Sequence, residues 1–279
     1  MPIDSSQEKH QTLLKLLQCA KRIAVAYSGG VDSAFLLRAS LEAVGPENVL
    51  AVIGVSPSYP SREYTEAISL AETLGAQYRV IHTEEIQDAR YAANPNNRCY
   101  YCKHDLFTRI IQLAEEEGYI AVVDGNNADD TGDWRPGQQA ARELGVRSPL
   151  IEVGMTKADI RDLSRVYGLP TWNKPASACL ASRIPYGTRI TPETLQTVEQ
   201  AENALRDLGF AQVRVRHHDA VARIEVAPDE IARFVDPQLR ETVGQQLRAL
   251  GYQFITLDLQ GYRMGSFNEA LSSKERSGS

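Results

Sequence analysis

Two hydrophobic patterns alternate over the first part of the chain. Short apolar runs predict buried strands, and segments with a helical period of apolar residues predict helices. The predicted strands are residues 22–27, 49–55, 78–82 and 119–123. The predicted helices are residues 32–43, 62–74 and 104–117. A fourth predicted helix begins at a capping box formed by Thr156 and Asp159 and ends at Tyr167. Because strands that alternate with helices build a parallel sheet covered on both faces, we expect an α/β domain over residues 1–170.

This alternation stops in the segment PTWNKPASACLASRIPYGTRI, residues 170–190. The segment holds three prolines and has no clear hydrophobic period, which is typical of a connection between domains. We therefore interpret residues 171–190 as a linker.

A different order of elements follows the linker. Thr191 and Pro192 open a helix to Leu208, since proline is favoured at the first helical position. The remaining pattern predicts strands at 211–216, 221–227 and 252–257 and helical stretches at 229–235 and 237–250. We expect a small α+β domain over residues 191–271 and a disordered tail over residues 272–279.

The composition is that of an ordinary soluble protein. The chain has 279 residues, of which 43% are hydrophobic and 24% are charged. No apolar run approaches the roughly 20 residues of a membrane span, and the first residues, MPIDSSQEKH, do not resemble a signal peptide. We therefore expect a cytoplasmic protein without a membrane partner. The formal charge of -6 argues against a nucleic-acid partner, which would favour a basic excess.

The segment SGGVDS, residues 28–33, follows the first predicted strand and opens a helix. Gly29 and Gly30 permit close backbone approach to a ligand, and the helix N-terminus favours an anion. Ser28 and Ser33 add hydroxyl donors, and Asp32 can face a magnesium ion. The lysine of the G-x-x-x-x-G-K-[ST] loop is missing, and the glycine spacing does not fit dinucleotide binding.

This loop resembles the pyrophosphate loop of the N-type ATP pyrophosphatases. The resemblance implies a Rossmann-like parallel sheet of the adenine nucleotide α-hydrolase type. It also implies that ATP is cleaved between its α and β phosphates, so that a carbonyl or carboxylate oxygen becomes adenylated before a nucleophile displaces AMP. Residues 1–170 are then the ATP pyrophosphatase domain.

A second polar loop, DGNNADDTGDWRPG, follows the strand at 119–123. Carboxylates with few other protein ligands suit magnesium, which usually keeps several waters. We expect ATP and its metal to contact Gly125, Asn126 and Asp130, and Arg135 to stabilise charge on a phosphate. A plain polar turn rich in Asn, Asp and Gly is the alternative.

Four cysteines bear on the nucleophile, and in a reducing compartment they are thiols or metal ligands. Cys19 lies in the apolar stretch TLLKLLQCA, so we expect it to be buried and inert. Cys99 and Cys102 form a C-x-x-C pair just before a predicted helix, where the dipole stabilises a thiolate. A zinc site would need two further ligands, for which the sequence offers no pattern.

Cys179 lies in the linker among basic residues. Lys174, Arg183 and Arg189 surround it in sequence, and such a setting lowers the pKa of a thiol. A buried loop cysteine is the alternative.

Four segments together resemble the LarE family over essentially the whole chain. They are KPASACLASRIPYGTRIT, RCYYCK, DGNNADDTGDWRPG and GYRMGSFN. The resemblance implies an ATP-dependent sulfur transferase that makes the nickel-pincer nucleotide cofactor of lactate racemase. Its substrate would be a pyridinium dicarboxylate mononucleotide, whose carboxylates are adenylated and then converted to thiocarboxylates. The family also tends to assemble, which implies a homo-oligomer.

The resemblance offers two sources of sulfur. In one, a lone linker cysteine attacks the acyl adenylate, and elimination leaves its sulfur on the substrate and dehydroalanine in the chain. In the other, the linker cysteine and a C-x-x-C pair hold a [4Fe-4S] cluster that carries an extra sulfide. Since this chain has Cys99, Cys102 and Cys179, the cluster form is our hypothesis.

The predicted second domain carries the segment VRVRHHDAVARIEVA, residues 213–227. On a strand, Arg214 and Arg216 point to the same side, and arginine suits phosphate. The LarE resemblance assigns Arg214, Arg216 and Glu225 to the substrate nucleotide, and we expect Arg183 to contact the substrate as well. Solvated arginines on an exposed sheet face are the alternative.

Three other functions share parts of this pattern. An ammonia-dependent synthetase shares the loop but gives no reason for the three cysteines. A tRNA-thiolating enzyme shares loop and cysteines, but the acidic chain has no evident RNA-binding appendage. A non-catalytic ATP-binding module would bind ATP without releasing pyrophosphate.

Overall fold

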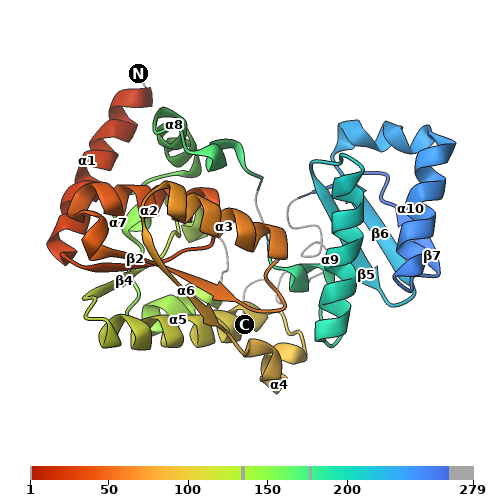
Figure 1. The fold of residues 1–279 in the computed structure, drawn as a ribbon, viewed down its shortest axis with the longest axis horizontal. Helices are drawn as coiled ribbons and strands as arrows, with labels where there is room; N and C mark the ends of the chain where they lie inside the picture. The colour runs from red at the N-terminus through yellow and green to blue at the C-terminus, as the bar shows by residue number, and fades with distance from the viewer. Residues whose placement is uncertain (1, 133–135, 176–177, 264–279) are drawn as a thin grey trace. The chain divides into compact units, whose positions relative to one another are not determined.

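The computed structural model describes residues 2–132, 136–175 and 178–263 (Figure 1). The chain divides into two compact units. The N-terminal unit consists of Met1–Asp88 and Asn97–Ser177, and the C-terminal unit consists of Ala89–Asn96 and Ala178–Ser279. Residues 171–190 are thus shared between the two units, and residues 89–96 belong to the second unit.

The N-terminal unit contains a four-stranded parallel sheet. Its strands are β1 (Ile23–Ala26), β2 (Val49–Val55), β3 (Gln77–His82) and β4 (Ala121–Val123), in the order β3-β2-β1-β4. All four were predicted from the apolar runs, and the α/β fold is confirmed. Because the strands are parallel, their carboxyl ends share one edge of the sheet, which is where ligands bind in open α/β folds.

Helices cover both faces of this sheet, as alternating side chains of the strands require (Figure 1). One face packs against α1 (Pro2–Ala20), α2 (Val31–Val44), α3 (Ser61–Thr73), α7 (Pro149–Glu152) and α8 (Lys157–Val166). The other face packs against α5 (Arg98–Glu116) and α6 (Pro136–Glu143). Short 3₁₀ turns are η1 (Pro46–Asn48), η2 (Glu85–Gln87), η3 (Ala128–Gly132) and η4 (Pro170–Asn173).

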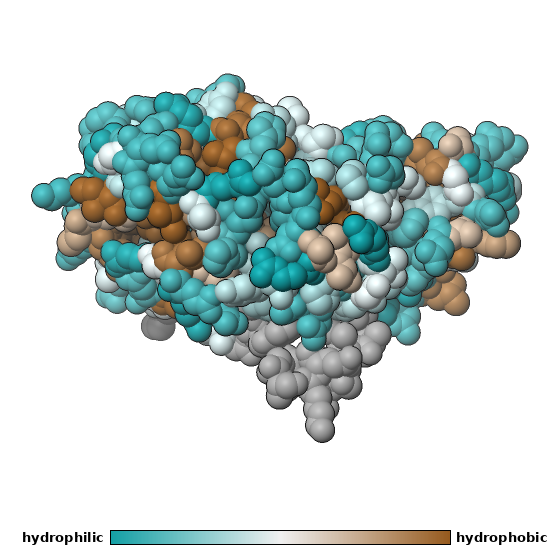
Figure 2. Space-filling model, turned by 90° about the horizontal axis from the view of Figure 1, so that it is seen from below, coloured by the Kyte–Doolittle hydropathy of each residue, from teal (hydrophilic) through white to brown (hydrophobic). Residues whose placement is uncertain are grey.

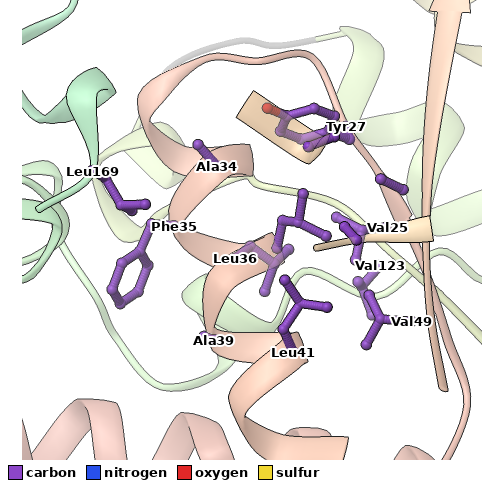
Figure 3. Close-up of a cluster of buried hydrophobic side chains, with 14 of the residues drawn as sticks. Val25, Tyr27, Ala34, Phe35, Leu36, Ala39, Leu41, Val49, Val123 and Leu169 are labelled. Atoms are coloured by element: carbon purple, nitrogen blue, oxygen red, sulfur yellow. The ribbon is translucent and has the colours of Figure 1, made fainter. Parts of the chain in front are cut away.

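The core beneath α2 is apolar and fully buried. Figure 3 shows Leu36 and Leu41 of α2 turned toward Val25 and Val49 of the sheet. This packing holds the N-terminus of α2 against the carboxyl end of β1, and the SGGVDS loop joins the two.

Two sequence predictions need correction in this unit. Cys19 is exposed, not buried. The inward side of α1 carries Leu13 and Leu17, and a residue two positions later lies about 200° around the helix. Helix α5 begins at Arg98, six residues before the predicted start, so Cys99 and Cys102 lie inside its first turns.

The C-terminal unit contains a three-stranded sheet. Its strands are β5 (Val213–His218), β6 (Val221–Val226) and β7 (Phe254–Leu257), with β5 antiparallel and β7 parallel to β6. Helices α9 (Pro192–Asp207) and α10 (Pro237–Ala249) pack on one face around Val213, Val215 and Ile224. The unit also holds α4 (Ala89–Ala92), η5 (Leu180–Arg183) and η6 (Pro228–Val235).

Backbone hydrogen bonds attach residues 89–96 to this unit. The Ile190 N–H donates to the Ala92 carbonyl, and the Gly187 N–H donates to the Asn94 carbonyl. The Asn94 side chain donates to the carbonyls of Ile184 and Pro185 and is fully buried. The segment therefore braces the chain that follows Cys179.

The face of the molecule drawn in Figure 2 is mainly polar. Figure 2 shows one face, on which hydrophobic residues lie in separate groups among hydrophilic ones. Over the described residues, no helix combines the length and the apolar character needed to cross a membrane.

Candidate active site

The loop between β1 and α2 has the backbone of an anion-binding turn. Gly29 adopts φ +64°, and a Cβ atom here would lie 2.7 Å from the Cβ atom of Ala67. Only glycine therefore fits without displacing α3. Gly30 is the N-cap of α2 and has no side chain to bond the N–H groups of the first turn. Those groups are suited to receive an anion.

The two loop serines meet at this turn. Their hydroxyl oxygens lie 3.1 Å apart, and Ser33 Oγ accepts a hydrogen bond of 3.2 Å from the Ser28 N–H. The Tyr59 hydroxyl donates to the Ser28 carbonyl at 3.0 Å. The structure thus brings together Ser28, Gly29, Gly30 and Ser33 in a single turn.

Lys157 reaches this loop from α8. Its Nζ atom lies 2.8 Å and 2.7 Å from the two carboxylate oxygens of Asp32. The Lys157 backbone N–H donates to Asp129 Oδ2 at 2.8 Å, and Thr156 with Asp159 forms the predicted capping box beside it. The start of α8 is therefore held firmly, and it delivers one ammonium group to the loop.

The Asp32 carboxylate is in a partly dry environment. Burial raises its pKa, the Lys157 ammonium opposes that rise, and the negative charge of Asp130 adds to it. The Lys157 ammonium therefore favours the charged form of this carboxylate, against the effect of burial.

Gly125 brings the second polar loop against the first. A Cβ atom at Gly125 would lie 2.9 Å from the backbone nitrogen of Ser33. Any larger residue would push this loop away from the start of α2. The glycine predicted to contact ATP therefore has a packing reason to be glycine.

Hydrogen bonds within the second loop fix its acidic groups. Asp124 is buried and accepts from the Asn126 N–H, from Asn126 Nδ2 and from Ser148 Oγ. Burial raises the pKa of Asp124, and these hydrogen bonds oppose the rise. Asp130 Oδ2 accepts from the Asn127 N–H at 3.0 Å. Arg135, the predicted phosphate ligand, lies outside the described residues.

Lys174 also lies at the loop. Its Nζ atom donates to Glu66 Oε2 at 2.8 Å and to the Gly29 carbonyl at 3.4 Å, and it forms an ion pair with Glu63. Burial lowers the pKa of Lys174, but the two glutamates outweigh this and raise it. The two glutamates of α3 therefore balance the charge of this ammonium.

The three cysteines are divided between the units. Cys99 is exposed and Cys102 is half-buried, three residues apart at the start of α5 in the N-terminal unit. Cys179 is half-buried and is the N-cap of the turn η5 in the C-terminal unit.

Arg183 closes the Cys179 turn from inside the C-terminal unit. Its side chain is 1% exposed and pairs with Glu202, whose side chain is fully buried. Its other N–H groups donate to the carbonyls of Ala178 and Cys179. The side chain predicted to contact the substrate is thus engaged with the turn itself.

One face of the β5–β6 pair is lined by charged side chains. Arg216 Nη2 donates to Glu225 Oε2 at 2.7 Å, and Arg223 Nη2 donates to Glu225 Oε1 at 3.1 Å. The Arg214 guanidinium lies over the Tyr262 ring, 5.3 Å from its centroid. Burial lowers the pKa of Arg214 to about 10, and the nearby Arg183 charge contributes. Arg214, Arg216 and Glu225 are therefore neighbours on a buried polar face, not solvated residues.

Comparison with known proteins extends over both units. A family model described as NAD synthase matches residues 11–113. An uncharacterized protein of Synechocystis sp. is 43% identical over 267 residues, which cover 95% of this chain and 99% of that protein. The pyridinium-3,5-bisthiocarboxylic acid mononucleotide synthase of Lactiplantibacillus plantarum is 39% identical over 264 residues, which cover 95% of each chain.

The chain belongs to the LarE family, that of pyridinium-3,5-bisthiocarboxylic acid mononucleotide synthase. By contrast, an ammonia-dependent NAD synthetase of Methanococcoides burtonii is 38% identical over only 72 residues, 26% of this chain. The LarE similarity therefore includes the Cys179 turn and the C-terminal unit, whereas the synthetase similarity is local.

The acidic groups near the loop include Asp32 and Asp130. Among the residues that the structure describes, no group of three His, Cys, Asp or Glu side chains could hold a metal ion. Magnesium typically takes one or two protein carboxylates together with phosphate oxygens and waters. Asp32, with Asp130 near it, fits that donor set.

Two residues that contact predicted site residues were missed by the sequence reasoning. Lys157 carries an identifiable signal, since it directly follows the N-cap threonine of a predicted helix. Glu202 carries none, because it lies mid-helix in α9 and its role depends on contacts with a turn 19 residues away.

Proposed function

We propose that this chain is an ATP-dependent sulfur transferase that converts the carboxylates of a pyridinium-3,5-dicarboxylate mononucleotide into thiocarboxylates. The observation that carries the proposal is the 39% identity to a named synthase over 95% of the chain. An ATP-binding loop alone would fit several reactions, but this similarity includes the Cys179 turn and the Arg214–Arg216 face.

Activation uses the SGGVDS loop. A substrate carboxylate oxygen attacks the α-phosphorus of ATP, the bond to the β-phosphate breaks, and pyrophosphate leaves. The N–H groups of the first turn of α2 and the hydroxyls of Ser28 and Ser33 receive the pyrophosphate oxygens. In our proposal, the second loop contacts ATP during this step. The contacting residues are Gly125, Asn126, Asp130 and Arg135.

Asp32 and Lys157 would exchange partners during activation. Magnesium at Asp32 would compensate the carboxylate, so Lys157 would be released from its ion pair toward the phosphates. Its ammonium then opposes the negative charge that develops as pyrophosphate departs.

Sulfur transfer follows at the acyl adenylate. A sulfur nucleophile attacks the activated carbonyl carbon, and AMP leaves with the bonding electrons. In the sacrificial form, the nucleophile is the Cys179 thiolate. Removal of its α-proton then breaks its Cβ–S bond, leaving a thiocarboxylate on the substrate and dehydroalanine in the chain.

The cluster form is supported by the cysteine pair at α5. Cys99 and Cys102 are three residues apart in a helix, a spacing that points two side chains to the same side, and a helix N-terminus favours thiolates. These two thiolates and Cys179 would hold a [4Fe-4S] cluster. When bound, the cluster would supply an iron that carries the transferable sulfide.

The nucleotide phosphate of the substrate is assigned to the charged face of the C-terminal unit. Arg214 and Arg216 provide guanidinium groups that match phosphate geometry, and Glu225 orients Arg216. We further expect the enzyme to work in the cytoplasm as a homo-oligomer, without nucleic-acid partners.

A pyrophosphate-release assay tests the activation step. We expect release from ATP to require both magnesium and the pyridinium dicarboxylate mononucleotide. Release with ammonia and a carboxylate of the NAD pathway would favour a synthetase, and release that requires tRNA would favour a tRNA-thiolating enzyme. Binding of ATP without any release would identify a non-catalytic module.

The sulfur source is tested on anaerobically purified protein. Iron and sulfide that depend on Cys99 and Cys102 would support the cluster form. A protein that never binds iron, yet loses the elements of hydrogen sulfide at Cys179 during reaction, would replace it with the sacrificial form.

A further inference from the structure

Arg183 makes an unusually complete set of contacts inside the C-terminal unit. Nε donates to Glu202 Oε1 at 2.7 Å, and Nη2 donates to Glu202 Oε2 at 3.0 Å. This is a two-point arginine–carboxylate pair, and both side chains are at most 1% exposed. A substrate group could reach Arg183 only by displacing Glu202.

The third guanidinium nitrogen of Arg183, Nη1, bonds to the turn that begins at Cys179. Nη1 donates to the Ala178 carbonyl at 2.7 Å, to the Cys179 carbonyl at 2.9 Å and to Ser182 Oγ at 2.9 Å. These three acceptors surround the turn whose N-cap is Cys179. One guanidinium therefore joins the turn to a buried carboxylate.

Glu202 makes further contacts of its own. It lies on α9, accepts from the Val215 N–H at 3.1 Å and receives a further ion pair from Arg206 at 2.8 Å. Burial opposes ionisation of Glu202, but Arg183, Arg214 and Arg206 together outweigh it and the pKa is lowered. The anchor of the turn is thus a charged group fixed to both α9 and β5.

A second arginine–glutamate pair holds the same turn. Arg216 Nη1 donates to the Ser182 carbonyl at 3.0 Å, while its Nη2 atom donates to Glu225. Glu225 is fully buried. Carbonyls just before the 3₁₀ turn and within it are therefore tied to α9 and to the sheet.

We propose that Arg183 and Glu202 act as a positioning pair that fixes the Cys179 turn for sulfur transfer, and that they do not contact the substrate. The assignment rests on the proposed function, in which Cys179 delivers or helps to hold the sulfur. Fixing a reacting group in advance raises the rate of its step without changing the affinity for the substrate. Lysine cannot replace the arginine, since an ammonium lacks the planar fork that spans Glu202 and two carbonyls.

The test compares R183K with a matched variant, R206K. Both changes weaken an ion pair to Glu202 and keep the positive charge, but of these two arginines Arg183 is the one that the described structure shows bonded to the Cys179 turn. Pyrophosphate release and thiocarboxylate formation are measured on the same samples, with the substrate KM for each. Circular dichroism and a thermal melt check that each variant is folded.

We expect R183K to lower the rate of thiocarboxylate formation about 10- to 100-fold, as displacement of a positioned group does. Its substrate KM and its pyrophosphate release should stay within about 2-fold of the wild type, because activation uses the other unit. R206K should keep both reactions within the same margin.

Three results would overturn the positioning role. A raised substrate KM with an unchanged rate constant in R183K would mean direct substrate contact. Equal losses in R183K and R206K would mean a general effect on the unit. Should R183K fail to fold, E202Q takes its place, and we expect the same loss of thiocarboxylate formation with unchanged pyrophosphate release. Failure of both variants to fold would mean that the pair has a purely structural role. Failure of the proposed function itself is a separate outcome, since the wild type would then form no thiocarboxylate.

Discussion

At the scale of single residues, the Lys157–Asp32 ion pair has the clearest chemical consequence. The pair joins positions 125 apart in sequence, so no local pattern could reveal it. Asp32 itself was predictable, because its motif lies between a strand and a helix. The partner depends on how α8 is oriented over the sheet, which only the structure supplies.

Replacing Lys157 with methionine tests this pair. We expect K157M to slow substrate-dependent pyrophosphate release about 100-fold, because it removes one positive group aimed at developing charge. K9M is the matched control, since Lys9 pairs with Asp159 on the same helix at 2.7 Å but away from the loop. Steady-state assays in which both variants lose activity equally would contradict the role of Lys157.

The loop glycines give a second prediction at this scale. G29A should destabilise the protein by about 1–3 kcal/mol, because the position has a positive φ and a Cβ atom would strike Ala67. G30A should cost less than about 1 kcal/mol, since a Cβ atom there meets only Ser28 Oγ at 3.5 Å. Urea unfolding without nucleotide measures both, and equal shifts would show that backbone strain at Gly29 is unimportant.

At the scale of elements, the hydrophobic pattern carried most of the information. Apolar runs located all four parallel strands. The central strands β1 and β2 are buried on both faces, whereas the edge strands β3 and β4 are only partly buried. The pattern failed where polar or backbone interactions define an element. Residues 89–96 join the C-terminal unit through hydrogen bonds to the backbone after Cys179, and such bonds leave no periodic signal. The prediction that Cys19 is buried was wrong because its apolar segment forms the helix α1, which has an exposed side, and Cys19 lies on that side.

The contact between α1, α2 and α8 predicts a pH effect. His10 of α1 lies within 3.0 Å of the Tyr167 hydroxyl, which donates to Glu42. Burial lowers the pKa of His10. The Glu42 charge raises this pKa and the Arg38 charge lowers it further, but burial has the largest effect. The unfolded chain therefore binds this proton more readily than the folded one. Stability should be complete above the ordinary histidine pKa of about 6.5 and fall as the pH drops through the folded value.

Thermal melts of H10Q between pH 7.5 and 5.5 measure this effect. The variant should lose less stability over that interval than the wild type, because one buried titrating group is gone. Y167F keeps His10 and should retain the wild-type pH dependence. A wild type and an H10Q variant with parallel pH profiles would rule out His10 as the cause.

At the scale of the whole molecule, activation and sulfur supply are assigned to residues in different units. The ATP loop belongs to the N-terminal unit, whereas Cys179 and the arginine face belong to the C-terminal unit. The sequence indicated both functions, because each depends on a compact motif. It could not indicate that Arg183 is buried and bound to Glu202, since that follows from the packing of α9 on β5.

The most direct measurement is mass spectrometry of the small-molecule product. The protein is incubated anaerobically with ATP, magnesium and the pyridinium-3,5-dicarboxylate mononucleotide, and C179A is treated in parallel. We predict that the wild type replaces carboxylate oxygen by sulfur, whereas C179A releases pyrophosphate but adds no sulfur. Pyrophosphate release by the wild type with an unsulfurated product, or sulfur transfer by C179A at the wild-type rate, would contradict the account.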